Sequence, residues 1–281
     1  MPGERVRSCN AVFVGGKFFV FDIGPGAARA IESLRLPVDQ LERIFITHWH
    51  ADHYIDLPEL INRSWLLGRT IPLHLHGPDP LDTIVQGMSQ FLGIENQFRV
   101  DHHGDELFDI NLSLPVSHNI TLDGMGYQKV YDQGGVTVEA FAVDHEPISP
   151  ALGYRIKYKG KSLVISGDTK RSDQVIKYAQ DADILLHEAL AFDLLERAIT
   201  IQKENNNTRA TTILTDILDY HTSPKEAAEV AAAASAKKLI LTHLGPAPEN
   251  PISRRFYAPG LDEIYEGSVL LAEDGDLYVI D

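Results

Sequence analysis

Short apolar runs alternate with turn residues along the chain, and this pattern predicts the buried strands of a sheet. The first two runs, 9–14 and 18–22, flank Gly15-Gly16, which predicts a β-hairpin. The segment 101–133 is polar and irregular, so we expect short strands there at most. Further strands are expected at 44–47, 73–76, 136–143, 153–158, 162–166, 184–186, 239–241, 268–271 and 277–280.

Capping signals mark helices between these strands. Ser223 can cap a helix, Pro224 suits its first position and Glu226 completes a capping box. Asp56 and Glu59 have the same spacing at the start of another helix. The remaining helices are expected at about 24–34, 172–180, 190–204, 210–219 and 260–266. Because strands and helices alternate without a repeat or a convincing linker, the sequence predicts a single α/β domain over residues 1–281.

Composition limits the classes of protein to which the chain can belong. Hydrophobic residues make up 44% of it, which is ordinary for a soluble globular protein, and no apolar run is long enough to span a bilayer. Cys9 is the only cysteine, so an intramolecular disulfide and a cysteine-rich zinc module are excluded. The formal net charge of −15 disfavours long nucleic acids as partners, because an acidic surface repels phosphate backbones.

Four potential metal ligands follow the apolar run 44–47 within six residues. They are His48, His50, Asp52 and His53. The three histidines are among twelve in the chain. In an extended backbone His48 and His50 project to the same side, so their imidazoles can share one metal ion. Asp52 and His53 are suited to a second ion beside the first. Imidazole and carboxylate without thiolate fit catalytic zinc, while Mn²⁺ or Fe²⁺ stays open.

Three further candidate ligands each end an apolar run. His145 follows the run 136–143, Asp168 follows the strand ending at 166, and His243 follows 239–241. A strand end fixes the direction of a ligand through the rigidity of the sheet. Their shared position therefore favours a metal site built from the ends of several strands.

These motifs resemble, in order and spacing, those of the metallo-β-lactamase fold superfamily. The 48–53 motif is followed by a lone His145, a Ser-Gly-Asp-Thr run at 166–169 and a Leu-Thr-His run at 241–243. The segments His187-Glu188-Ala189 and 221–223 are similar to those of the ribonuclease Z and arylsulfatase-like branch. The resemblance covers the chain from about residue 12 to its end. It implies an αββα sandwich, with two mixed β-sheets packed face to face between helices.

The resemblance also implies a dinuclear zinc centre and a hydrolytic reaction. One zinc ion would be held by His48, His50 and His145, the other by Asp52, His53 and His243, with Asp168 bridging. A hydroxide bridging the metals would attack an ester bond, and Asp52 could take up its proton. His221, which lies just before a capped helix start, would stabilise transition-state charge or protonate the leaving group, with Glu188 orienting it. Lys170 and Arg254 are weaker candidates for binding an anionic substrate.

Several substrates remain open at this point. A small phosphodiester or sulfate ester is the first choice, and the alternatives are a ribonuclease Z-type tRNA 3′-end endonuclease and a lactonase or β-lactamase-like hydrolase. Ribonuclease Z commonly carries a long tRNA-binding arm between the third and fourth motifs. Here only 23 positions separate His145 from Asp168, and two expected strands fill them. A non-catalytic binding module is disfavoured, because all seven ligand positions are intact.

The start of the chain and five histidines stand apart from these motifs. Family members usually begin with a strand before the segment matching 7–9, so the first family strand is expected to be missing. A signal peptide could be lost with it, which leaves the compartment unknown, with a soluble cytoplasmic protein as the default. A homodimer is left open. The histidines that match no motif are His74, His76, His102, His103 and His118; His74 and His76 are expected to be a satisfied or surface pair.

Overall fold

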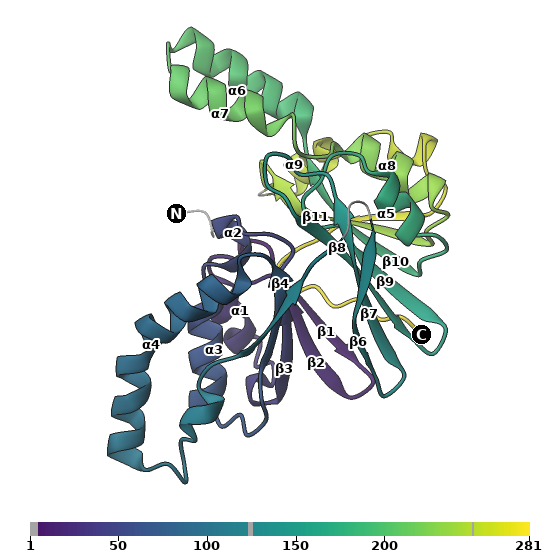
Figure 1. Ribbon diagram of the computed structural model, residues 1–281. Coiled ribbons are helices and arrows are strands. Elements are labelled where there is room, and N and C mark those ends of the chain that lie inside the picture. The colour runs from purple at the N-terminus through teal and green to yellow at the C-terminus, as the bar shows by residue number, and fades with distance from the viewer. Residues whose placement is uncertain (1–4, 123–125, 249) are drawn as a thin grey trace. The chain divides into compact units, whose positions relative to one another are not determined.

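The computed structural model describes residues 5–122, 126–248 and 250–281 (Figure 1). The chain divides into two compact units, which we call the N-terminal unit (Arg5–Thr121) and the C-terminal unit (from Leu122 to Asp281). Each unit contains one mixed β-sheet with its own helices. The prediction of a single hydrolase domain over 1–281 stays a prediction. Among the described residues, no helix combines the length and apolar character needed to cross a membrane.

The N-terminal unit contains a five-stranded sheet in the order β1-β2-β3-β4-β5. β1 and β2 form the predicted antiparallel hairpin, and the other neighbours pair in parallel. Gly15 and Gly16 both have positive φ values, which the tight turn requires. The strands are β1 (Asn10–Val14), β2 (Lys17–Phe21), β3 (Leu41–Phe45), β4 (His74–Pro78) and β5 (Val116–Ile120). The helices are α1 (Ala27–Ser33), α2 (Ala51–Tyr54), α3 (Leu57–Leu66) and α4 (Leu81–His103), with 3₁₀ turns at Val38–Gln40 and Ile110–Leu112.

One face of this sheet forms a hydrophobic core with the helices. Val20, Ile44 and Leu75 lie on neighbouring strands and belong to the same buried cluster as Ile31 of α1 and Leu60 of α3. Alternation along each strand places these side chains on one face, because successive residues point to opposite sides. The core therefore supports β3, which leads into the histidine motif, and its neighbour β2, which ends next to Asp22.

Two predictions for the N-terminal unit are wrong. The segment expected to be irregular from 101 begins inside α4, which buries only four residues and so lacks the apolar stripe by which a helix is recognised. Asp56 precedes α3 but forms no side-chain cap there. Its carboxylate instead accepts a hydrogen bond from the Ala28 N–H in the first turn of α1, at 3.2 Å. Asp56 thus links two helices rather than closing a capping box.

The C-terminal unit contains a seven-stranded sheet in the order β12-β11-β10-β9-β8-β7-β6. The strands from β6 to β9 form an antiparallel meander, and those from β9 to β12 run in parallel. The strands are β6 (Tyr127–Gln133), β7 (Val136–Val143), β8 (Ala151–Tyr158), β9 (Lys161–Ile165), β10 (Ile184–Leu190), β11 (Lys238–Gly245) and β12 (Ser268–Leu271). The helices are α5 (Asp173–Tyr178), α6 (Phe192–Glu204), α7 (Thr208–Ile217), α8 (Pro224–Ala233) and α9 (Pro251–Tyr257), with a 3₁₀ turn at Leu261–Glu263.

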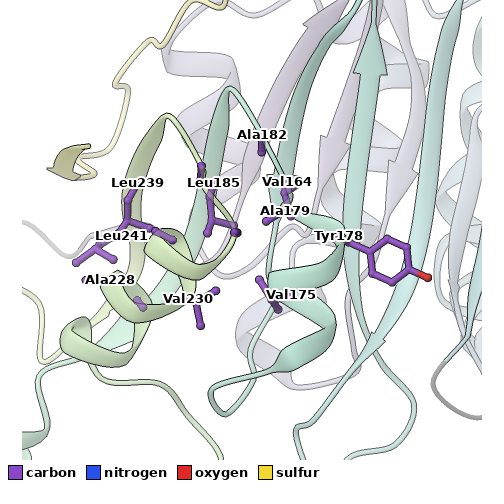
Figure 2. Close-up of a cluster of buried hydrophobic side chains, with 14 of the residues drawn as sticks. Val164, Val175, Tyr178, Ala179, Ala182, Leu185, Ala228, Val230, Leu239 and Leu241 are labelled. Atoms are coloured by element: carbon purple, nitrogen blue, oxygen red, sulfur yellow. The ribbon is translucent and has the colours of Figure 1, made fainter. Parts of the chain in front are cut away.

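Helices α5 and α8 cover one face of the parallel strands. Figure 2 shows Val175 of α5 and Val230 of α8 beside Leu185 of β10 and Leu239 of β11, all part of one buried cluster. The predicted cap of α8 is confirmed, because Ser223 and Glu226 form both hydrogen bonds of a capping box. Burial of this apolar face fixes the strand ends on which the candidate site residues lie.

The last part of the chain differs from the prediction. The helix expected at 260–266 is a single 3₁₀ turn, whereas α9 was not expected. Residues 277–280 are a run of apolar and aromatic side chains but form no strand, and Leu277 and Val279 are 82% and 65% exposed. An apolar run alone does not make a strand, because the backbone also needs a neighbouring strand with which to pair.

Three of the unassigned histidines lie side by side on two neighbouring strands of the N-terminal unit, His74 and His76 on β4 and His118 on β5. The Arg43 guanidinium donates to Nε2 of His76 at 2.9 Å, and the ring of His76 stacks on that of His118 at 4.5 Å. His74 Nδ1 lies 2.8 Å from His118 Nε2, so His74 and His76 are satisfied by different partners. Burial lowers the pKa of His76 to about 2, and the neighbouring His118 and Arg43 act in the same direction. His76 is therefore neutral in the folded protein.

We expect the neutral His76 to make the protein sensitive to acid. The unfolded chain binds a proton at this histidine near pH 6.5, whereas the folded chain does not bind it until about pH 2, so stability present above pH 6.5 is lost as the pH falls. The loss from this group is about 1.4 kcal/mol per pH unit below 6.5. Urea unfolding at pH 7.5, 6 and 5 should show a shallower pH dependence for His76→Gln than for wild type. His102→Gln, at an exposed helix end, serves as the control. Equal slopes for all three proteins would contradict the expectation.

Candidate metal centre

The segment 46–50, which follows β3, and the next helix, α2, bring three histidines together in the N-terminal unit. His48 and His53 are fully buried, and their ring centroids are 4.1 Å apart. His48 Nε2 lies 3.0 Å from His50 Nδ1, a separation at which two nitrogens can bind one ion at zinc–nitrogen distances of about 2.0 Å. Asp52 lies in the first turn of α2 and is half-buried. The three histidines of the 48–53 motif thus lie close together.

Asp22, which no motif in the sequence indicated, anchors this segment. Its buried carboxylate accepts hydrogen bonds from the Thr47 N–H at 2.8 Å and the Thr47 hydroxyl at 2.9 Å. It also accepts one from His53 Nδ1 at 2.8 Å. The Thr47 hydroxyl, having donated to Asp22, accepts from His48 Nδ1 at 3.0 Å. Both imidazoles therefore carry their proton on Nδ1, which leaves each Nε2 able to bind a metal ion.

Gly24 lets the turn after β2 lie directly against the start of α2. Ile23 donates its N–H to the carbonyl of His53 at 2.7 Å, so the two segments are joined by their backbones. A Cβ atom at Gly24 would lie only 2.0 Å from the carbonyl oxygen of Asp52. A side chain is consequently excluded at this position, and the glycine is required by the close approach to the metal-binding motif.

The C-terminal unit contributes three candidate ligands, two from loops that follow strands and one from within β11. His145 follows β7 and is buried, and its Nδ1 donates to the carbonyl of Tyr220 at 2.8 Å, which again leaves Nε2 as the ligand atom. Asp168 follows β9 and is also buried. Its Oδ2 lies 3.6 Å from His243 Nε2. His145 and Asp168 thus follow strands, whereas β11 extends past the expected end at 241 and includes His243.

A register shift between β10 and β11 directs His243 towards Asp168. Glu188 is paired with Thr242 and Leu190 with Gly245, so β11 advances three residues where β10 advances two. His243 lies within this bulge and has a φ of 48°, an unfavourable conformation for a residue with a side chain. Asp22 also has a positive φ, of 58°. The same left-handed conformation occurs away from the site, for example at Lys159 and Ser235, so it describes the local path of the backbone at both residues.

Glu188 and His221 form a buried pair beside Asp168. Oε1 of Glu188 accepts hydrogen bonds from His221 Nδ1 at 2.9 Å, from the Thr169 N–H at 3.1 Å and from the Thr222 N–H at 3.2 Å. Burial by itself would lower the pKa of His221, but the charges of Glu188 and Asp168 and the hydrogen bond more than offset it, so the pKa of His221 is raised. The hydrogen bond to Glu188 uses Nδ1 of His221, so Nε2 is the ring nitrogen left on the opposite edge.

Helices α6 and α7 form a hairpin that lies between Glu188 and His221 in the sequence (Figure 1). The base of the hairpin is closed by backbone hydrogen bonds. Leu190 donates its N–H to the carbonyl of Thr222 at 2.9 Å, and Ala191 donates to Gly245 at 2.7 Å. The two catalytic candidates are thus fixed by the sheet rather than by the hairpin.

The donor set fits a divalent metal ion. In the C-terminal unit, two groups of three residues place one ligand atom each within 4.8 Å of one another: His145 with Asp168 and His221, and Glu188 with His221 and His243. Imidazole nitrogens next to a buried carboxylate are the donors expected for zinc.

The two weaker substrate-binding candidates have structural contacts. The Lys170 N–H donates to the carbonyl of Asp144 at 2.8 Å, which joins the loops after β7 and β9. The Arg254 guanidinium forms an ion pair with Glu273 at 2.9 Å and also donates to the carbonyl of Leu271. These contacts hold Arg254 against the C-terminal segment, and a role for either residue in substrate binding stays a prediction.

Comparison with known proteins agrees with this geometry. A family model described as a β-lactamase superfamily domain matches residues 18–244. The chain belongs to the metallo-β-lactamase superfamily. It is 30% identical over 246 residues to the ribonuclease Z of Mycolicibacterium gilvum, an alignment that covers 86% of this chain and 79% of that protein. The fold is similar to that of the short form of human tRNase Z, with a TM-score of 0.69, 22% identity and coverage of 100% of this chain and 95% of that one.

A second solved structure gives the same fold. It is the metallo-β-lactamase fold protein YhfI of Bacillus subtilis, with a TM-score of 0.66, 18% identity and coverage of 97% of this chain and 91% of that one. The predicted fold class, two mixed sheets with helices in the metallo-β-lactamase fold, is therefore confirmed. The chain is a metal-dependent hydrolase of this superfamily, related to ribonuclease Z. Its His/Asp clusters are consistent with the dinuclear metal site typical of such enzymes.

Proposed function

We propose that the protein is a dinuclear zinc enzyme that hydrolyses a small phosphodiester or sulfate ester. The observation that carries this proposal is the buried Glu188–His221 pair beside Asp168, because it holds an imidazole of fixed orientation next to candidate metal ligands. The carboxylates of Glu188 and Asp168 raise the pKa of His221, which favours its use as a donor of a proton or a hydrogen bond to an anionic oxygen. Such a donor suits an ester whose leaving group develops negative charge.

The metal ligands in this proposal are the seven residues named from the sequence. His48, His50 and His145 would hold one ion, Asp52, His53 and His243 the other, and Asp168 both. When bound, two divalent cations would supply Lewis acidity and a water molecule of lowered pKa. Zinc is the first choice, and Mn²⁺ or Fe²⁺ is compatible with the same nitrogen and oxygen donors. Asp52 would accept the proton released from the attacking water.

His221 acts on the substrate in this proposal and Glu188 acts through it. The Nδ1–H of His221 donates a hydrogen bond to Glu188 Oε1 at 2.9 Å, which fixes the orientation of the ring. Nε2 is therefore the ring nitrogen that would contact the substrate. The Thr169 and Thr222 amides hold the same carboxylate oxygen, which limits the movement of Glu188. His221 would thus protonate the leaving group or stabilise charge on a phosphoryl or sulfuryl oxygen.

The size of the substrate is inferred from the interval between His145 and Asp168. Strands β8 and β9, joined by a tight turn, occupy this interval, with no inserted arm. The net charge of −15 also opposes binding of a long polyanion. A small anion near bound cations is a different case, because the ions reverse the local sign of the charge.

Cleavage of precursor tRNA is the second candidate. The specific observation in its favour is that curated relatives at about 30% identity are named ribonuclease Z, and their alignments cover most of this chain. The bond broken in that reaction is also a phosphodiester, so the same catalytic residues would serve. Lactones and β-lactams are included among the substrates to be tested. The formation of a homodimer stays a prediction.

Metal analysis and a substrate panel test the proposal. We expect purified protein to contain close to two zinc, manganese or iron ions per chain and to lose activity when a chelator removes them. With zinc restored, an aryl phosphodiester or aryl sulfate should be hydrolysed with a higher kcat/KM than a lactone, a β-lactam or precursor tRNA. Fewer than one ion per chain would overturn the enzyme assignment. Efficient tRNA cleavage with negligible turnover of small esters would overturn the ranking of substrates.

A further inference from the structure

His187 is a buried histidine that the proposed mechanism does not use. It lies on β10 between Leu185 and Ala189, two residues of the hydrophobic cluster beneath α5 and α8, and its side chain is fully buried. Burial lowers the pKa of His187 to about 4, although its hydrogen bond to Glu188 and the charge of Glu226 act in the other direction. A neutral, polar ring in an apolar core is costly unless its polar atoms are used.

The ring makes one hydrogen bond, and it is made to the backbone of a candidate catalytic residue. His187 Nδ1 lies 2.7 Å from the carbonyl oxygen of Glu188. A carbonyl oxygen can only accept, so Nδ1 carries the proton. Nε2 has no hydrogen-bond partner within the part of the chain that the structure describes. The donor at Nδ1 is therefore the polar function that distinguishes histidine from an apolar residue at this position.

The Glu188 carbonyl lies where β10 leaves its regular pairing with β11. The register shifts immediately after Glu188, and the following Leu190 N–H bonds to Thr222 instead of continuing the ladder. A bulge interrupts the regular ladder, so the backbone groups beside it depend on other partners. The Glu188 N–H donates to Ser166 Oγ at 3.1 Å and the Ala189 carbonyl accepts from the Tyr257 hydroxyl at 2.6 Å, while the Glu188 carbonyl between them accepts from His187. A change in the direction of the Glu188 peptide group would shift the Glu188 carboxylate, which binds His221 and the amides of Thr169 and Thr222.

We infer that His187 is a positioning residue, whose Nδ1–H bond to the Glu188 carbonyl fixes the bulge and so holds the Glu188 carboxylate against His221. The inference rests on the proposed function insofar as His221 acts on the substrate. Its structural part, the fixing of the Glu188 carboxylate, is independent of which substrate is cleaved. Residues that orient a catalytic group in this way typically contribute about 10- to 100-fold to activity.

Three substitutions separate the hydrogen bond from packing. His187→Asn places its side-chain N–H at the position of Nδ1, His187→Gln places it at the position of Nε2, and His187→Leu keeps the bulk without a donor. In the zinc-loaded, full-length protein, we expect Leu and Gln to lower kcat for the best small ester about 10- to 100-fold, with KM and metal content unchanged. Asn should retain most of the wild-type kcat.

Amide hydrogen exchange provides a readout that needs no substrate. We expect the Thr169 and Thr222 amides to exchange faster in the Leu and Gln variants but not in Asn, while the Thr47 amide, which bonds to Asp22, is unchanged. If wild type hydrolyses no substrate in the panel, the proposed function fails and exchange still decides the inference. If Leu does not fold, the comparison of Asn with Gln decides it. Wild-type kcat and protection in Gln, or equal losses in Asn and Gln, would overturn it.

Discussion

His50→Ala is expected to abolish hydrolysis while leaving the fold intact. The His50 ring is half-buried at the end of the segment after β3, and its Nδ1 lies 3.0 Å from His48 Nε2. Removing it takes one imidazole from a proposed metal site and opens no cavity in the hydrophobic core. Lewis-acid stabilisation of the transition state is worth several kcal/mol, and about 4 kcal/mol corresponds to a thousandfold in rate. We therefore expect kcat/KM to fall at least about a thousandfold.

Metal content and unfolding measured on the same preparation complete this test. The His50→Ala protein should retain less than one ion at the concentration that saturates wild type, and its far-UV circular dichroism should match that of wild type. His102→Ala removes an imidazole from the exposed end of α4 and should change neither activity nor metal content. Full activity in His50→Ala would show that the metal assignment is wrong.

Gly24→Ala should destabilise the N-terminal unit and weaken metal binding together. The added Cβ would lie 2.0 Å from the Asp52 carbonyl oxygen and 2.7 Å from Cβ of Arg7. Neither contact is relieved by rotating a flexible side chain, because one atom is backbone and the other is attached to it. Overpacking commonly costs about 1–3 kcal/mol, and we expect this substitution to reach or exceed the upper end. Urea unfolding and zinc titration would measure the two effects.

Gly87→Ala is the matched control for this substitution. Gly87 lies inside α4, and apart from the helix's own backbone no heavy atom of the described residues lies within 4 Å of the point that an alanine methyl group would occupy. The methyl group added by Gly87→Ala would therefore make no close contact. Alanine is favoured over glycine in a helix, and we expect a gain of about 0.5–1 kcal/mol. A Gly24→Ala protein as stable as wild type would show that the turn after β2 can move away from α2 without cost.

The features that could be predicted from sequence are those encoded locally. The 48–53 motif places four potential ligands within six residues, and the capping box of Ser223 and Glu226 needs only its own helix. Asp22 could not be found in this way, because its partners Thr47 and His53 are 25 and 31 residues away. Its position at the end of an apolar run, shared with Asp168, was the available signal.

Errors in the predicted elements also have local causes. Helix α4 buries few residues and contains Gly87 and Gly93, so neither periodicity nor helix propensity marks it. Residues 277–280 have the apolar and aromatic side chains typical of a strand, but the hydrogen bonds of a strand depend on a neighbour that the segment does not have within the described residues. Pairing is a long-range property, and a local pattern cannot supply it.

Exchanging or lengthening the α6–α7 hairpin should leave the reacting groups where they are. The chain enters the hairpin after Leu190 and returns at Thr222, and a backbone hydrogen bond joins these two residues. Glu188 and His221 lie on the sheet side of that bond, so a change in the hairpin is not transmitted to them as a shift in register. The hairpin is thus a segment in which related enzymes can vary recognition independently of chemistry, as surface connections on a rigid scaffold commonly do.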